Sequence, residues 1–83
     1  MPRRIPRDIS GEALIGKLMV YGYIATRQSS SHVRLTRSLP EGDQHLTIPL
    51  HKSLRIGTLN GILNDVATQI DKQKAEIVDE LFG

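Results

Sequence analysis

Residues 23–37 read YIATRQSSSHVRLTR, and the expected sheet is built around them. Its two halves, residues 23–28 and 32–37, alternate apolar and polar side chains and contain several β-branched residues, which is typical of strands. Three serines lie between the halves, where a turn would reverse the chain. The stretch therefore predicts two antiparallel strands joined by a serine turn, with His32 at the start of the second strand.

A third strand is predicted further along the chain. Residues 39–43 contain Pro and Gly in the arrangement of a tight turn. Residues 45–51 then alternate, with Leu46, Ile48 and Leu50 on one side. The three runs together predict an antiparallel meander.

Helical periodicity precedes the meander. Leu14, Leu18 and Tyr21 recur at the spacing of one helical face. Ser10 is the expected N-cap of this helix, and Gly22 can take the left-handed conformation that ends it. We therefore expect an amphipathic helix directly before the first strand.

Two further helices are predicted after the strands. Gly57 and Thr58 offer the N-cap of the first, and Asp71 is expected to cap the second, over residues 72–82. The first has apolar residues at helical spacing, namely Leu59, Ile62, Leu63, Val66 and Ile70. The chain is therefore expected to be α+β, in the order α-β-β-β-α plus a terminal helix, with helices on one face of a three-stranded antiparallel sheet.

Strand alternation assigns side chains to the two faces of this sheet. Because successive side chains point to opposite faces, Val33 and Leu35 are expected to face the helices. His32, Arg34 and Thr36 then share the solvated face. On the third strand the outward residues are expected to be His45, Thr47, Pro49 and His51. All three histidines are thus predicted on the open side of the sheet.

Length and composition limit the class of protein. With 83 residues, the chain is expected to form one domain over residues 9–83, preceded by a basic arm over residues 1–8. It has no cysteine, which excludes disulfides and thiolate metal ligands and is compatible with a reducing cytosol. Its apolar runs are shorter than the roughly 20 residues that span a bilayer, and the N-terminus lacks the apolar segment of a signal peptide. We therefore expect a cytoplasmic protein with no membrane partner.

Charge is divided unevenly along the chain. Residues 1–56 carry nine Lys and Arg against four Asp and Glu, whereas residues 57–83 carry two against five. A basic part followed by an acidic part indicates an anion-binding surface backed by a solvated or partner-binding tail. The alternative is ordinary surface charge that happens to segregate.

His32 is the candidate for chemistry. Imidazole exchanges protons near neutral pH. Arg27, Arg34 and Arg37 lie close to it in the sequence, and their charges would attract a phosphodiester. The combination indicates chemistry on a nucleic acid backbone, with an ordinary exposed strand histidine as the alternative.

The same segments resemble the HicA (YcfA-like) toxins of bacterial type II toxin–antitoxin modules over roughly residues 10–70. The resemblance is carried by Gly22-Tyr23, Arg27-Gln28, Ser31-His32, the strand Leu46-Thr47-Ile48-Pro49-Leu50-His51, Gly57-Thr58-Leu59 and Ile62-Leu63. It implies a double-stranded-RNA-binding-domain-like fold and an mRNA interferase, a toxin that cleaves RNA and is neutralised by a HicB-type antitoxin. It also implies that His32, as the histidine of the family's Gly-Ser-His motif, is catalytic.

One position departs from that motif. Ser30 stands where the family has glycine, which permits a positive φ or a close approach of a phosphate to the backbone. The serine hydroxyl could contact the phosphate instead. Activity could therefore be lower than in family members with the glycine.

A metal-independent mechanism is the resulting hypothesis, with no cofactor. RNA carries its own nucleophile, the 2′-hydroxyl, so cleavage needs proton transfer and charge stabilisation. His32 would act as general base or acid, and Arg27 or Arg34 would stabilise the developing charge on the phosphorane. The residues expected to contact RNA or its phosphates are Arg27, Ser30, Ser31, Arg34, His51, Lys52 and Arg55.

Other functions and roles stay open on the sequence alone. The chain could be a small module that binds double-stranded RNA without cutting it. It could also be an interaction protein that pairs with another chain through its acidic terminal helix or its sheet. His51 could orient the loop before the second helix instead of contacting RNA. The arm residues Arg3, Arg4 and Arg7 could reach a phosphate backbone or remain solvated.

Overall fold

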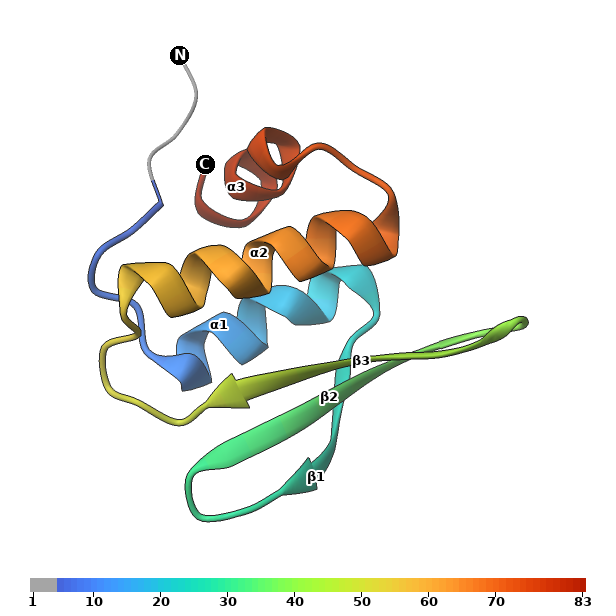
Figure 1. Cartoon of the computed structure of the whole chain (residues 1–83), viewed down its shortest axis with the longest axis horizontal. Coiled ribbons are helices and arrows are strands. Elements are labelled where there is room, and N and C mark those ends of the chain that lie inside the picture. Colours follow the sequence, from blue (N-terminus) through green and yellow to red (C-terminus); the bar gives the residue numbers. More distant parts are fainter. Residues whose placement is uncertain (1–4) are drawn as a thin grey trace.

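The computed structural model describes residues 5–83, and its element order confirms the expected α+β class (Figure 1). The elements are α1 (Gly11–Leu18), the 3₁₀ turn η1 (Met19–Tyr21), β1 (Ile24–Gln28), β2 (His32–Leu39), β3 (Gly42–Pro49), α2 (Ile56–Ile70) and α3 (Lys74–Phe82). The strands form one antiparallel sheet in the order β1-β2-β3. This is the order of the double-stranded-RNA-binding-domain-like fold. The first part of the expected basic arm, with Arg3 and Arg4, lies outside the described residues.

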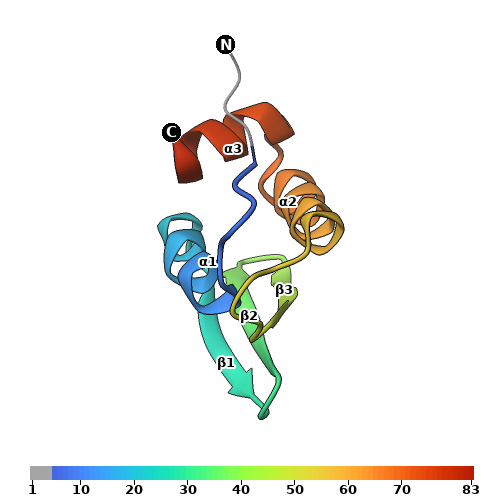
Figure 2. The ribbon, with the colours of Figure 1, turned by 90° about the vertical axis from the view of Figure 1, so that its left-hand side faces the viewer.

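The molecule has three layers, as Figures 1 and 2 show together. The sheet is the first layer, α1 and α2 lie side by side on one of its faces, and α3 lies over these two helices on the side away from the sheet. Val33 and Leu35 are buried between sheet and helices, which confirms their predicted orientation. Within residues 5–83 no helix covers the opposite face, so β2 has one buried side and one open side.

The start of α1 follows the predicted capping. The Oγ of Ser10 accepts a hydrogen bond from the backbone N–H of Ala13 at 3.0 Å, which satisfies one of the free donors of the first turn. At the other end, Gly22 takes φ = 91° directly after η1, the left-handed conformation that glycine adopts without steric cost. The helical segment is therefore limited at both ends by residues that the sequence indicates.

Gly11 joins α1 to the end of β3. Its backbone N–H donates to the carbonyl of His51 at 3.0 Å, and a Cβ at this position would clash with the carbonyl oxygen of Pro49. Only glycine allows the helix to come this close to the strand. The contact fixes the chain where β3 leaves the sheet, next to the start of β2.

Two predicted helix caps are wrong. The N-cap of α2 is Arg55, two residues before Gly57, and it makes no side-chain cap hydrogen bond. Asp71 ends α2 in the left-handed conformation, with φ = 56°, instead of capping the next helix. The N-cap of α3 is Gln73, which forms a capping box with Glu76. A short polar side chain such as Asp tolerates the left-handed region, which is why it suits a helix end as well as a helix start.

A polar group made of Tyr21, Lys72 and Glu80, here called the latch, attaches α3 to the rest of the molecule. The hydroxyl of Tyr21 donates to Oε1 of Glu80 at 2.6 Å, and Nζ of Lys72 lies 2.7 Å from Oε2 of the same carboxylate. The hydrogen bond from Lys72, followed by that from Tyr21, lowers the pKa of Glu80 below its ordinary value. Burial, followed by the hydrogen bond and charge of Glu80, raises the pKa of Tyr21. The latch therefore favours a charged Glu80 and a neutral Tyr21.

Among the described residues, no helix is both long enough and apolar enough to cross a membrane.

Candidate active site

The turn before β2 is held by the side chain of Ser29. Its Oγ accepts hydrogen bonds from the backbone N–H of Ser31 at 3.3 Å and of His32 at 3.1 Å. The backbone N–H of Ser29 donates to the carbonyl of His32 at 2.9 Å, which closes the hairpin. Serine side chains often form such local bonds in turns, because their hydroxyl can replace a backbone acceptor. The position of His32 is thus fixed by the turn that precedes it.

A β-bulge in β1 brings Arg27 to the open face. Ala25 pairs with Leu35 on the buried face, but Arg27 pairs with Arg34, so Thr26 is an extra residue in β1. Strict alternation from Ala25 would have turned Arg27 toward the helices. The bulge shifts the phase by one residue and re-aims the side chain. Arg27 and Arg34 therefore face each other on neighbouring strands.

The two arginines, His32 and two hydroxyl residues surround a shallow hollow on the open face. Its volume is about 210 Å³, and its lining residues are Arg27, Ser29, His32, Arg34 and Thr47. All five are exposed. Within residues 5–83, neither Arg27 nor Arg34 has a hydrogen bond or ion pair to its guanidinium. Like charges opposite each other in a sheet destabilise it, so an anion between these arginines would relieve the repulsion.

The ring of His32 is held by its neighbour in the chain. The Oγ of Ser31 lies 2.7 Å from Nδ1 of His32. The carbonyl of Ser31 accepts a hydrogen bond from the backbone N–H of Leu50 at 2.8 Å, which continues the pairing of β2 with β3 beyond the strand end. The backbone of Ser31 is therefore held by Leu50, and its side chain contacts the imidazole of His32.

Ser30 occupies its place in the turn without a positive φ. Asp71 is the one non-glycine residue with positive φ in the described part of the chain, so the backbone of Ser30 lies in a region open to any L-residue. Ser30 is also exposed at the tip of the hairpin. Serine at this position, where the resemblance implies glycine, thus causes no backbone strain.

A second group of polar residues on the open face is engaged in its own hydrogen bonds. Thr36 was expected to be solvated, but it is only 7% exposed. Its Oγ1 lies 2.6 Å from Oγ1 of Thr26 and 3.1 Å from Nδ1 of His45, so these neighbours cover it. The bulge at Thr26 supplies part of this cover. His45 is therefore on the predicted face but outside the hollow around His32.

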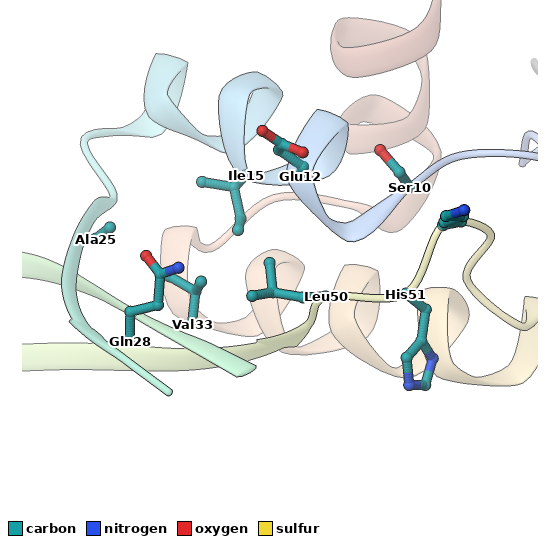
Figure 3. Close-up of a pocket in the computed structure, with 9 residues that line it drawn as sticks. Ser10, Glu12, Ile15, Ala25, Gln28, Val33, Leu50 and His51 are labelled. Atoms are coloured by element: carbon teal, nitrogen blue, oxygen red, sulfur yellow. The ribbon is translucent and has the colours of Figure 1, made fainter. Parts of the chain in front are cut away.

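His51 and Lys52 lie apart from the hollow. β3 ends at Pro49, so His51 belongs to the following loop and not to the predicted strand. Both residues line a cleft of about 410 Å³ between α1 and the sheet, together with residues such as Ile15 and Leu50. Figure 3 shows this cleft, with the ring of His51 directed away from α1.

Arg55 lies in a third place. It lines a hollow of about 440 Å³ at the start of α2, together with Arg7, Ser53, Leu54 and Ile56. The structure thus brings Arg27, Ser31, His32 and Arg34 together, whereas Lys52 and Arg55 are in other cavities. Among the described residues, no group of three or more His, Cys, Asp or Glu side chains is arranged to hold a metal ion.

Sequence reasoning missed two residues of the hollow. Ser29 could have been found as the first residue of a serine turn, whose side chain often bonds to the backbone N–H two residues later. Thr47 could have been found from the hairpin, because pairing of Leu39 with Gly42 across a two-residue turn puts Thr47 opposite Arg34. Both positions thus follow from a turn, the serine turn before β2 for Ser29 and the tight turn between β2 and β3 for Thr47.

Comparison with known proteins gives a family for this arrangement. Residues 11–67, well over half of the chain, match the family described as the HicA toxin of bacterial toxin–antitoxin systems. No match was found among curated proteins or among solved structures. The matched segment contains the serine turn, the bulged strand, His32 and both arginines. The chain therefore belongs to the HicA family of bacterial toxin–antitoxin toxins.

Proposed function

We propose that this protein is a cytoplasmic endoribonuclease that cleaves mRNA without a metal ion, with His32 as its catalytic residue. A HicB-type antitoxin would neutralise it by covering the open face. Family membership supports the toxin role, and the hollow around His32 supports the choice of site.

One observation carries the proposal. Arg27 and Arg34 are paired directly across two strands, both are exposed, and neither has an acidic partner among the described residues. An anion bound between the two guanidinium groups would offset their repulsion, and a phosphodiester has two oxygens that guanidinium groups can contact. His32 lies in the same hollow, so a phosphate bound by the arginines would be beside an imidazole.

The chemistry follows from the properties of RNA. The 2′-hydroxyl loses its proton and its oxygen attacks the adjacent phosphorus, while the bond from phosphorus to the 5′-oxygen of the next nucleotide breaks. The products are a 2′,3′-cyclic phosphate and a 5′-hydroxyl. His32 would carry out one of the two proton transfers, with water carrying out the other. Arg27 and Arg34 would stabilise the extra negative charge of the phosphorane.

The test is cleavage of an end-labelled RNA oligonucleotide in the presence of a chelator. The parent protein is compared with His32→Ala and with His45→Ala, a matched control on the same face but outside the hollow. We expect the parent and His45→Ala to release fragments with 2′,3′-cyclic phosphate ends. We expect His32→Ala to cleave more slowly by a factor of about 10²–10⁴, the usual contribution of a general acid or base.

Other results would contradict the proposal. Cleavage by His32→Ala at the parent rate would remove His32 from the reaction. Fragments that end in 5′-phosphate, with no cyclic intermediate, would exclude attack by the 2′-hydroxyl. RNA binding by the parent without any cleavage would favour the module that binds RNA but does not cut it.

A further inference from the structure

The hydroxyl of Ser31 occupies one ring nitrogen of His32. Its Oγ is 2.7 Å from Nδ1, within hydrogen-bond distance, and the two residues are adjacent in the chain. The ring nitrogen that remains available to a substrate in the hollow is therefore Nε2. In a neutral imidazole one nitrogen carries the proton and the other accepts, and the partner of one nitrogen sets the state of the other.

The hydroxyl of Ser31 is presented from a fixed backbone. Its carbonyl is bonded to the N–H of Leu50 on the β3 side, and its own N–H is bonded to Oγ of Ser29 on the β1 side. The N–H of His32 is bonded to the same Oγ of Ser29. Both ends of the contact between Ser31 and His32 are thus held by the hairpin, which limits how far the imidazole can rotate.

We propose that Ser31 is the positioning residue of His32, with its Oγ accepting a hydrogen bond from Nδ1–H so that Nε2 carries the lone pair. The inference rests on the proposed function, in which His32 transfers a proton during cleavage. As a base, His32 takes the proton of the 2′-hydroxyl on Nε2. As an acid, it releases a proton from Nε2. In both cases Nδ1 keeps its hydrogen and donates it in a hydrogen bond to Oγ of Ser31, so the same contact is present with the neutral and with the charged ring.

This role differs from the one predicted for Ser31 from the sequence. A serine that binds phosphate donates its O–H to the substrate, whereas in this role Oγ accepts a hydrogen bond from the imidazole. The two roles give different kinetics. Loss of a phosphate contact raises KM, whereas loss of an orienting contact lowers kcat, because the ring spends less time in the reactive arrangement.

The first test needs no RNA. In ¹⁵N-labelled protein, the nitrogen chemical shifts of each histidine report which ring nitrogen carries the proton. We expect the Nδ1–H tautomer at His32 in the parent and in Ser31→Thr, which keeps the hydroxyl, and a shift toward the Nε2–H tautomer in Ser31→Ala. His45, bonded to Thr36, is an internal reference that should not change. An Nε2–H tautomer in the parent, or the parent tautomer in Ser31→Ala, would overturn the inference.

The second test measures cleavage by the same variants. Ser31→Ala should lower kcat about tenfold with little change in KM, as expected for the loss of one orienting hydrogen bond, and Ser31→Thr should restore most of it. Ser38→Ala, an exposed serine at the far end of β2, is the control. A rise in KM alone would assign Ser31 to phosphate binding and overturn the inference. An unchanged rate in His32→Ala would instead refute the proposed function while leaving the tautomer result standing.

Discussion

The two faces of β2 differ in what they contribute. On the inner face, Val33 and Leu35 are buried in one core with residues of α1 and α2, and they carry no polar group in their side chains. On the outer face, His32 and Arg34 are exposed and line a hollow that includes Arg27 of β1. Alternate residues of one strand thus serve separate purposes. The inner face can therefore stabilise the fold while the outer face keeps charges that do not favour folding.

The largest expected effect is on the inner face. Leu35 is fully buried at the centre of the sheet. Leu35→Ala should lower the free energy of unfolding by about 2–5 kcal/mol, because it removes buried methyl groups and leaves a cavity. Denaturant unfolding followed by circular dichroism measures this. The exposed Ser38→Ala should change the same quantity by less than about 0.5 kcal/mol. An equal loss of unfolding free energy in both variants would contradict the conclusion that the inner face stabilises the fold more than the outer face does.

A smaller effect of the opposite sign is expected on the outer face. Arg34→Gln removes the like-charge repulsion with Arg27 and should raise the free energy of unfolding by about 0.2–1 kcal/mol. The same change should weaken RNA binding and lower the slope of log affinity against log salt concentration by about one. The measurements are denaturant unfolding and RNA titration at several salt concentrations.

Arg37 of the same strand is the matched control for Arg34. Its Nε donates to the carbonyl of Tyr21 at 2.9 Å, and its Nη1 donates to Oε1 of Gln44 at 2.8 Å. Arg37→Gln should therefore lower stability and leave the salt dependence of RNA binding unchanged. If both arginines changed the salt dependence equally, binding would not be confined to the hollow on the outer face.

The smallest effect is expected at the latch, which belongs to neither face of the sheet. The pKa of Glu80 is lowered in the folded protein, so its contribution to stability is present above the ordinary carboxyl pKa and is lost as pH falls through the lowered value. Glu80→Gln should lower the melting temperature slightly at pH 7, and the difference from the parent should shrink as the pH falls from about 5 to 3. Thermal unfolding across this range measures it, and a difference that grows with acidity would contradict the latch. RNA cleavage at pH 7 should be unchanged.

Much of the fold could be predicted from the sequence because its signals are local. The alternation of Val33 and Leu35 assigned the buried face, and Ser10 and Gly22 limited the first helix. The caps of the later helices were not predictable in the same way. Asp71 suits both a helix start and a helix end, and only packing of α3 on α2 decides between them.

The site was only partly predictable. His32 and Arg34 follow from alternation in β2, but Arg27 reaches the open face through a bulge at Thr26 that no turn or glycine signals. The cover over Thr36 depends on the same bulge. Lys52 and Arg55 line two other cavities and not the hollow around His32. The sequence could not show this, because the position of a charge in a loop depends on the three-dimensional path of the chain.

The role of His32 is tested most directly by measuring stability and cleavage on one sample of His32→Ala. We expect a free energy of unfolding within about 0.5 kcal/mol of the parent value, since His32 is exposed, together with RNA cleavage slower by about 10²–10⁴. Undiminished cleavage by the folded variant would contradict a catalytic role of His32, and so would a loss of cleavage that is explained by unfolding.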